Sequence, residues 1–176
     1  MQRRHIPLGL LVALLALAAD QVSKRLVLEW SRSWTEQLNP VAPFLDFVAL
    51  WNSGISYGLF PQGETGRWVL VAIKVAAALL FSVWLTRSRG RLEAVALGLL
   101  IGGAIGNAVD RVVYGAVFDF VSLHAFGYRW YVFNIADVAV VVGVGLLLYD
   151  AFFGRASKLP PSVTPMAPKS EPEREP

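Results

Sequence analysis

Residues 92–114 read LEAVALGLLIGGAIGNAVDRVVY, and this segment decides the fold. As a helix rising about 1.5 Å per residue it would extend about 35 Å, enough to cross ~30 Å of hydrocarbon. The run is too long for a core strand and too apolar to be left in water. Gly98, Gly102 and Gly106 recur at a spacing that lets a second helix approach closely. We therefore expect a membrane-spanning helix that packs tightly against another helix.

Three other runs have a similar length and apolar character: residues 6–28, 68–86 and 131–153. Together with the first run they predict an all-α membrane protein with four transmembrane helices. Two connecting segments carry strand-like patterns, FLDFVALW at 44–51 and VFDFV at 117–121. We expect both to join a small β-layer on the outer (periplasmic) membrane face. Residues 1–157 would then form a single membrane domain.

The composition is that of a membrane protein rather than of a soluble domain. Hydrophobic residues make up 55% of the chain and charged residues 16%, against roughly 25% charged in soluble domains. There is no cysteine, which excludes disulfides, zinc-thiolate sites and thiol nucleophiles. His5 and His124 lack the spacing of metal ligands, so we expect no metal and no other cofactor. The net charge of +3 comes from basic residues beside apolar runs, so we expect no nucleic-acid partner.

The residues that flank the runs predict the orientation in the membrane. Basic residues fall on one side of a four-span arrangement: Arg3, Arg4, Arg87, Arg89, Arg91, Arg155 and Lys158. Because cytoplasmic loops are enriched in lysine and arginine, both termini are expected in the cytoplasm. Five tryptophans lie at or beyond the outer ends of the spans and agree with this orientation: Trp30, Trp34, Trp51, Trp68 and Trp130.

The first apolar run has two interpretations, a cleavable signal peptide or a retained span. The first run also resembles a cleavable signal peptide, with Arg3 and Arg4 before it and small residues near 16–19. Cleavage there would leave three spans and is compatible with the charge pattern. The run continues to Leu28, however, which favours its retention as a full span.

Residues 158–176 contain six prolines among 19 residues and are expected to form a disordered cytoplasmic tail.

Ionisable residues inside the spans are costly, by about 2.5–3.5 kcal/mol at the bilayer centre, so each needs a reason. The pattern Asn-x-x-Asp occurs twice, at Asn107–Asp110 and at Asn134–Asp137. Counted from the basic ends of their helices, both aspartates lie about 27–28 Å from the cytoplasmic boundary, close to the outer interface. Asp20 lies about 24 Å from that boundary, slightly further from the outer interface, and Asp119 lies just beyond the third span. Several carboxylates therefore converge on one shallow layer.

Carboxylates in one layer can form a catalytic pair. Two that are held close together cannot both ionise easily, so one keeps a proton. Such a pair contains an acid and a base and can hydrolyse a peptide by activating water. Spacing alone favours Asp110 with Asp137, because Asn107 and Asp110 share one helical face. A structural interpretation stays open, in which the aspartates pair with Lys24, Arg111 or Lys74, or cap helix ends.

Two other functions are compatible with parts of the sequence. Residues 54–58 match G-x-S-x-G, and His124 could act as the base for Ser56 in a serine hydrolase. That motif requires a strand-to-helix turn, and Pro61 with Gly63 opposes a continuing helix. The carboxylates, which lie at a similar depth in the membrane, could instead relay ions in a small transporter or proton-relay protein. Such proteins often contain internal repeats, and the repeated Asn-x-x-Asp is a faint example.

Five ordered blocks of this chain resemble the lipoprotein signal peptidases of bacteria. The blocks are DQVSK at 20–24, NSGISYG at 52–58, GGAIGNAVDR at 102–111, VFDF at 117–120 and FNIAD at 133–137. Each block alone is weak, but five in order on a four-span protein are highly specific. They cover nearly the whole of the predicted folded part.

The resemblance implies an aspartic endopeptidase that removes signal peptides from prolipoproteins, cleaving before a diacylglyceryl-modified cysteine. The catalytic aspartates of the family lie in the V-x-D-F and F-N-x-A-D blocks, which implies Asp119 and Asp137 here instead of Asp110. The residues expected to line the cavity or support the site are Asn52, Gly54, Asn107, Asp110, Arg111, Asn134, Asp20 and Lys24. Phe118 departs from the pattern, since valine is expected before the catalytic aspartate.

The resemblance also implies a location and partners. The protein would be a multi-pass protein of the bacterial cytoplasmic (inner) membrane, with its active site near the outer face. Its partners would be lipid-modified prolipoproteins and membrane lipids, and we expect a monomer. Asp20 lies on the first span, so the resemblance favours retention of that span as well.

Overall fold

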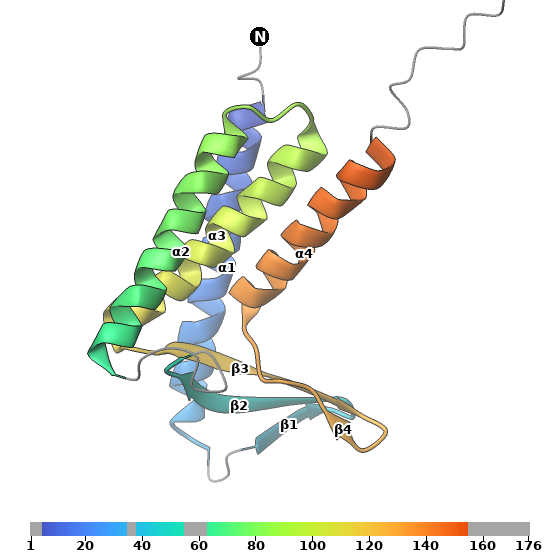
Figure 1. Cartoon of the computed structure of the whole chain (residues 1–176). Coiled ribbons are helices and arrows are strands. Elements are labelled where there is room, and N and C mark those ends of the chain that lie inside the picture. The colour runs from blue at the N-terminus through green and yellow to red at the C-terminus, as the bar shows by residue number, and fades with distance from the viewer. Residues whose placement is uncertain (1–4, 35–37, 55–62, 155–176) are drawn as a thin grey trace, which may run out of the picture.

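Four long helices form a bundle that carries a small β-sheet at one end (Figure 1). The computed structural model describes residues 5–34, 38–54 and 63–154. In these ranges the helices are α1 (Ile6–Ser31), α2 (Glu64–Leu85), α3 (Arg91–Tyr114) and α4 (Ile135–Tyr149), the last followed by a π-helical turn (Asp150–Gly154). Each is long and apolar enough to cross a membrane. The predicted four-helix membrane fold is therefore confirmed.

The sheet has four antiparallel strands in the described chain, in the order β1-β2-β3-β4. They are β1 (Leu38–Ala42), β2 (Leu45–Asn52), β3 (Val117–Ala125) and β4 (Tyr128–Arg129). The two strand-like patterns of the sequence correspond to β2 and β3, which pair although α2 and α3 separate them along the chain. Asn52 pairs with Val117, so the end of β2 lies beside the chain that leaves α3.

Glycines on α3 show how closely the helices pack. Most of the membrane-length segment of α3 is buried, whereas only a minority of residues in the segments of the other three helices are buried. A Cβ built on Gly102 would lie 2.5 Å from the carbonyl oxygen of Ala13 in α1. On the adjacent face, a Cβ built on Gly103 would lie 2.5 Å from the carbonyl oxygen of Ala136 in α4. The backbones of α1 and α4 therefore approach α3 at positions where a side chain would not fit.

Gly102→Ala is expected to lower the thermal midpoint of unfolding in detergent, because the added methyl group meets the backbone of α1. Overpacking of this kind costs about 1–3 kcal/mol. The matched control is Gly145→Ala in α4, where nothing lies within 4 Å of the added Cβ. That change should be neutral or stabilising by ~0.5–1 kcal/mol, since alanine favours helix more than glycine does. Equal destabilisation by both would contradict this role of Gly102.

The helices differ from the predicted spans at their ends. α4 begins at Ile135 and not at Tyr131, because Asn134 caps it with a side-chain oxygen that accepts the backbone N–H of Asp137 at 3.0 Å. Asp137 accepts the backbone N–H of Asn134 at 3.3 Å, which completes a capping box. The other differences are that α1 continues to Ser31, α2 begins at Glu64 and α3 begins at Arg91. Hydropathy marks the apolar middle of a span, whereas the helix ends where its hydrogen bonds end.

Aromatic side chains connect the sheet to α1. Phe118 and Phe120 of β3 are buried and stack with their ring centroids 5.9 Å apart. Phe47 of β2 packs edge-on against Phe120, and also against Trp30 at the end of α1. The phenylalanine that replaces the expected valine at position 118 thus belongs to a continuous aromatic core. The first four residues of β3 are buried, and Asp119 lies between Phe118 and Phe120 in this buried stretch.

Candidate active site

Asp119 lies in β3, close to where this strand bridges to the chain entering α4. Its exposed fraction is 2%. Asn52, at the end of β2, donates from Nδ2 to Asp119 Oδ2 at 3.0 Å. Asn134 donates from Nδ2 to Asp119 Oδ1 at 2.6 Å. Each oxygen of this buried carboxylate therefore has an amide donor.

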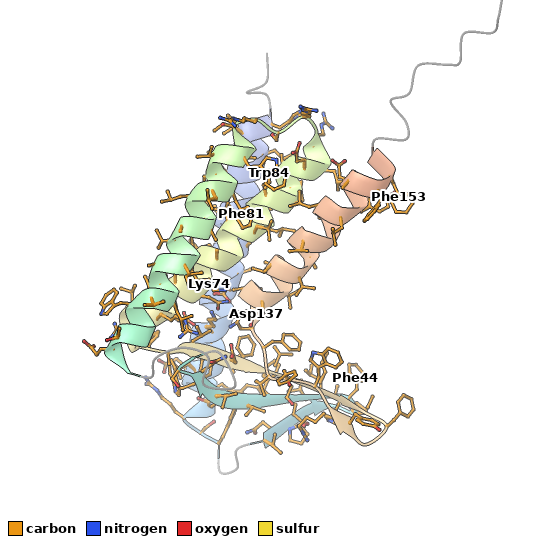
Figure 2. The ribbon with its side chains drawn as sticks, viewed as in Figure 1. Phe44, Lys74, Phe81, Trp84, Asp137 and Phe153 are labelled. Carbon is orange, nitrogen blue, oxygen red and sulfur yellow. The ribbon has the colours of Figure 1, made fainter. Side chains whose placement is uncertain are left out.

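Asp137 lies in the first turn of α4 and is only partly buried. Its Oδ2 accepts the backbone N–H of Asn134, and its Oδ1 accepts Asn107 Nδ2 at 2.9 Å. A carboxylate in this position is favoured by the helix dipole. Figure 2 shows Asp137 at the sheet end of α4, where the helix bundle meets the sheet.

Two asparagine side chains connect the two aspartates. Asn134 is fully buried, and its Nδ2 reaches Asn107 Oδ1 at 3.1 Å as well as Asp119. Asn107 in turn donates to Asp137. Asn134 therefore caps α4 with its oxygen and holds Asp119 with its nitrogen. β3, α3 and α4 thus place both carboxylates in one hydrogen-bonded cluster.

The pKa of Asp119 is raised to about 6. Burial is the largest cause, and the nearby charge of Asp137 acts in the same direction. The hydrogen bonds from Asn52 and Asn134 act in the opposite direction, because they favour the ionised form. A carboxyl with this pKa exchanges its proton close to neutral pH. Such a pair can present one acid and one base to a molecule bound between them.

A buried ionic network lies next to the pair. Lys24 of α1 is 4% exposed, and its Nζ lies 2.8 Å from Asp20 Oδ2 and 2.9 Å from Asp110 Oδ2. The same Nζ donates to Asn107 Oδ1 at 3.2 Å. Because the oxygen of Asn107 accepts from Lys24, its nitrogen is directed toward Asp137. The ammonium group of α1 thereby orients an amide that holds a candidate catalytic carboxylate.

Asp20 and Asp110 also join separate elements of the fold. Asp20 accepts the backbone N–H of Ala136 in α4 at 2.9 Å, and Asp110 accepts the backbone N–H of Phe118 in β3 at 3.1 Å. Gln21, to which sequence reasoning assigned no role, joins the two. Its Nε2 lies 3.1 Å from Asp20 Oδ2 and 3.0 Å from Asp110 Oδ1. The signal in the sequence was a second polar residue beside Asp20 in an apolar run.

Arg111 and Gly54 lie near the end of β2. Arg111 is 5% exposed, and its Nη1 donates to the carbonyl oxygen of Ser53 at 3.3 Å. Its Nε has no hydrogen-bond partner in the part of the chain that the structure describes. Gly54 donates its backbone N–H to Asn52 Oδ1 at 3.2 Å, which directs the amide nitrogen of Asn52 toward Asp119.

An apolar groove of about 740 Å³ opens beside Asp137. α4 forms one wall and the sheet forms the other. The lining residues include Val138, Val141 and Val142 from α4, Leu123 and Tyr128 from the sheet, and Phe44 from the turn between β1 and β2. Its lining is mostly aliphatic and aromatic, which suits an acyl chain or an apolar peptide.

His124, the candidate base of the serine alternative, also lines this groove. Its Nε2 lies 3.3 Å from Asp46 Oδ2. Its proposed nucleophile, Ser56, lies outside the described residues. Within the described ranges, no three His, Asp or Glu side chains are grouped so that they could hold a metal ion.

The structure brings the predicted site residues into one connected cluster. Direct hydrogen bonds or ion pairs link all of them except Arg111, which reaches the end of β2 through Ser53. Asp110 contacts Lys24 and Gln21, whereas Asp119 and Asp137 are held by asparagines. The division into catalytic and supporting residues stays a prediction.

Comparisons with known proteins agree on one family. Residues 12–153 match the family model described as signal peptidase (SPase) II. The chain is 54% identical over 144 residues to a lipoprotein signal peptidase of Methylorubrum extorquens, covering 81% of this chain and 84% of that protein. It is 49% identical over 164 residues to one of Methylobacterium radiotolerans, covering 92% and 96%. A solved structure, described as a bacterial membrane enzyme determined in meso at 2.3 Å resolution, superposes with a TM-score of 0.75 at 27% identity, covering 93% and 99%.

Proposed function

The chain belongs to the signal peptidase II family, and we propose that it is an aspartic endopeptidase that removes signal peptides from prolipoproteins. The peptide bond cleaved is the one before a cysteine that carries a diacylglyceryl group. Asp119 and Asp137 are the proposed catalytic pair. One observation carries this proposal: two carboxylates share one asparagine-bridged cluster, and the pKa of one is raised to about 6.

In the proposed reaction one aspartate starts ionised and the other protonated. Asp119 suits the protonated role because its pKa is raised, and Asp137 suits the role of base because it is partly exposed beside the groove. Asp137 takes a proton from water while the water oxygen attacks the carbonyl carbon, and Asp119 gives its proton to the carbonyl oxygen. The tetrahedral intermediate then collapses. The C–N bond breaks, the nitrogen takes the proton held by Asp137, and Asp119 recovers its own.

The neighbouring residues have distinct proposed roles. Asn52 and Asn134 hold Asp119 in place, and Asn107 holds Asp137. Arg111 and Gly54 are proposed to line the substrate cavity. The Nε of Arg111, which has no partner among the described residues, supports this, because a guanidinium donates readily to a polarised carbonyl or to ester oxygens of a lipid.

We further propose that the protein lies in the bacterial cytoplasmic (inner) membrane, with both termini in the cytoplasm and the aspartate pair near the outer face. The basic loop between α2 and α3 supports this orientation, since it lies at the end of the bundle opposite the sheet (Figure 1). Residues 1–157 are proposed as one catalytic membrane domain and 158–176 as a cytoplasmic tail. We propose a monomer, because the cluster is complete within one chain.

The proposal is tested with the purified full-length protein and one prolipoprotein in two forms, with and without the diacylglyceryl group on its cysteine. We expect release of the signal peptide from the lipidated form and little or none from the other. Mass spectrometry of the products identifies the cleaved bond. Failure to cleave the lipidated form, or cleavage elsewhere than before the cysteine, would overturn the proposal.

The pH dependence of kcat/KM gives a further prediction. Above about pH 6 the free enzyme loses the proton of Asp119, so kcat/KM should fall as pH rises, approaching tenfold per pH unit. Asn52→Ala removes a hydrogen bond that favours the ionised form, so it should move this decline to higher pH. The measurement is initial rates at low substrate concentration between pH 5 and about 9. A rate that rises throughout this range would contradict a protonated Asp119.

A further inference from the structure

α2 supplies none of the predicted site residues, yet a side chain near its start, at the sheet end of the bundle, reaches the end of α3 (Figure 1). Arg67 donates from Nε to the carbonyl oxygen of Arg111 at 2.7 Å and from Nη2 to that of Val112 at 2.6 Å. Its Nη1 lies 3.6 Å from Glu64 Oε1, and its Cζ lies 5.0 Å from the ring centroid of Trp68. The side chain is 23% exposed. All three nitrogens of this guanidinium are therefore engaged within the protein.

The carbonyl groups that Arg67 binds belong to the final turn of α3. The last four carbonyl groups of an α-helix lack intrahelical donors, and α3 ends at Tyr114. The chain then turns at Gly115, which has a left-handed φ of 82° and returns its N–H to the carbonyl oxygen of Arg111 at 3.1 Å. A forked cation also suits the negative end of the helix dipole. Arg67 thus caps α3 from a neighbouring helix.

This end of α3 separates two parts of the candidate site. Asn107, Asp110 and Arg111 precede it on α3, and Asp119 follows it on β3. Only two residues lie between the end of α3 and the start of β3. A rotation of the final turn of α3 would therefore be transmitted to β3. It would move Asp119 relative to Asn107, the amide that holds Asp137.

Other contacts join the two sides of the α3–β3 turn to each other. Asp110 Oδ2 accepts the backbone N–H of Phe118 at 3.1 Å. The ring of Trp51 packs across the turn, with its centroid 5.2 Å from that of Tyr114 and 5.1 Å from that of Phe118. These contacts close the turn but do not connect it to α2. In the part of the chain that the structure describes, Arg67 makes the hydrogen bonds that connect the turn to α2.

We propose that Arg67 is a positioning residue, which fixes the α3–β3 turn and thereby places Asp119 relative to Asn107 and Asp137. It acts through backbone carbonyl groups rather than by contact with the substrate, because its donors are already engaged. Lysine replaces it only in part, since one ammonium group does not present two donors in a fixed fork. The inference rests on the proposed function, in which Asp119 and Asp137 act together.

Cleavage of the lipidated precursor is measured for full-length Arg67→Gln and Arg67→Lys, with rates expressed per amount of folded protein. We expect kcat/KM to fall about 10–100-fold in Arg67→Gln and less in Arg67→Lys, since a misplacement of about 1 Å can cost ~10²-fold. The decline of kcat/KM at high pH should also move to higher pH, as expected for Asn52→Ala, because a displaced Asp119 loses amide donors that favour its ionised form. Glu64→Gln is the matched control. It removes the ion pair of Arg67 but leaves both carbonyl contacts, so its pH profile should equal that of the wild type.

Gly102→Ala distinguishes positioning from a general loss of stability. It disturbs the packing of α3 against α1, away from the α3–β3 turn, so it should lower the thermal midpoint without moving the pH profile. A pH profile that is unchanged in Arg67→Gln would overturn the proposal. Activity that is lost only in proportion to the fall in thermal midpoint, as in Gly102→Ala, would also overturn it and make Arg67 a structural cap.

A second measurement does not need the reaction. Because the chain has no cysteine, nitroxide labels can be attached at Val113→Cys on α3 and Leu123→Cys on β3, where the native side chains are 62% and 38% exposed. Pulsed EPR should give a shifted or broader distance distribution in Arg67→Gln and an unchanged one in Glu64→Gln. A distribution unaffected by Arg67→Gln would overturn the inference even where the precursor is cleaved. If the wild type cleaves no precursor, the proposed function fails, while the distance distribution still decides whether Arg67 holds the turn.

Discussion

Asp119→Asn and Asp137→Asn are each expected to abolish cleavage of a lipidated precursor, with kcat/KM lowered about 10³-fold or more. Asparagine keeps the size of the side chain but can neither carry the acid proton nor accept a proton from water. If the two carboxylates act as one catalytic unit, as proposed, the single variants and the double variant should be almost equally inactive. The measurement is the rate of signal-peptide release, with the thermal midpoint of each variant recorded to show that it is folded.

A matched control distinguishes loss of catalysis from a general effect of replacing an aspartate of α4. Asp150→Asn lies at the opposite end of α4 and should leave the cleavage rate unchanged. Asp110→Asn should lower stability more than Asp119→Asn does, because Asp110 is ion-paired with Lys24. Full activity in either the Asp119 or the Asp137 variant disproves the pair. Activity lost only in Ser56→Ala would point instead to a serine hydrolase.

The membrane fold was predictable because length and hydropathy are local properties of the chain. An apolar run long enough to cross the bilayer must satisfy its backbone groups internally, and a helix does this without any partner. The close approach of α1 to α3 was predictable for a similar reason, since Gly98 and Gly102 leave room on one helical face. The start of α4 was harder to predict from the sequence. The apolar run continues upstream of Asn134, and only the capping box marks the residue at which the helix begins.

Helical spacing alone favours Asp110 as the partner of Asp137, whereas the proposed partner is Asp119. Asn107 and Asp110 do lie close together on α3, but only Asn107 reaches Asp137, while Asp110 contacts Lys24 and Gln21 of α1. Three helices meet at this level, so one face of α3 serves two neighbours. Asp119 is brought to the site by long-range pairing of β3 with β2, for which the sequence has no periodic signal. The resemblance to a family supplied this position, and the hydrogen bonds supply a physical reason for it.

Lys24→Met is expected to destabilise the protein by about 3–5 kcal/mol, the usual cost of leaving buried charges without their partner. Asp20 and Asp110 are 0% and 1% exposed, and Lys24 Nζ lies within 3 Å of a carboxylate oxygen of each. The free energy of unfolding in detergent or the thermal midpoint measures this loss. Arg25→Met, which removes the exposed cation next along α1, is the matched control and should change stability little.

Charge compensation should rescue part of this loss. In Lys24→Met/Asp20→Asn only one uncompensated carboxylate of the network is left, so the double variant should be more stable than Lys24→Met alone. It should not recover normal cleavage, because Asn107 Oδ1 has still lost the ammonium group that directs its nitrogen toward Asp137. Stability that returns without activity would separate the two roles of Lys24. Stability unchanged by Lys24→Met alone would contradict the buried network, and recovery of full activity in the double variant would show that Asn107 is oriented without Lys24.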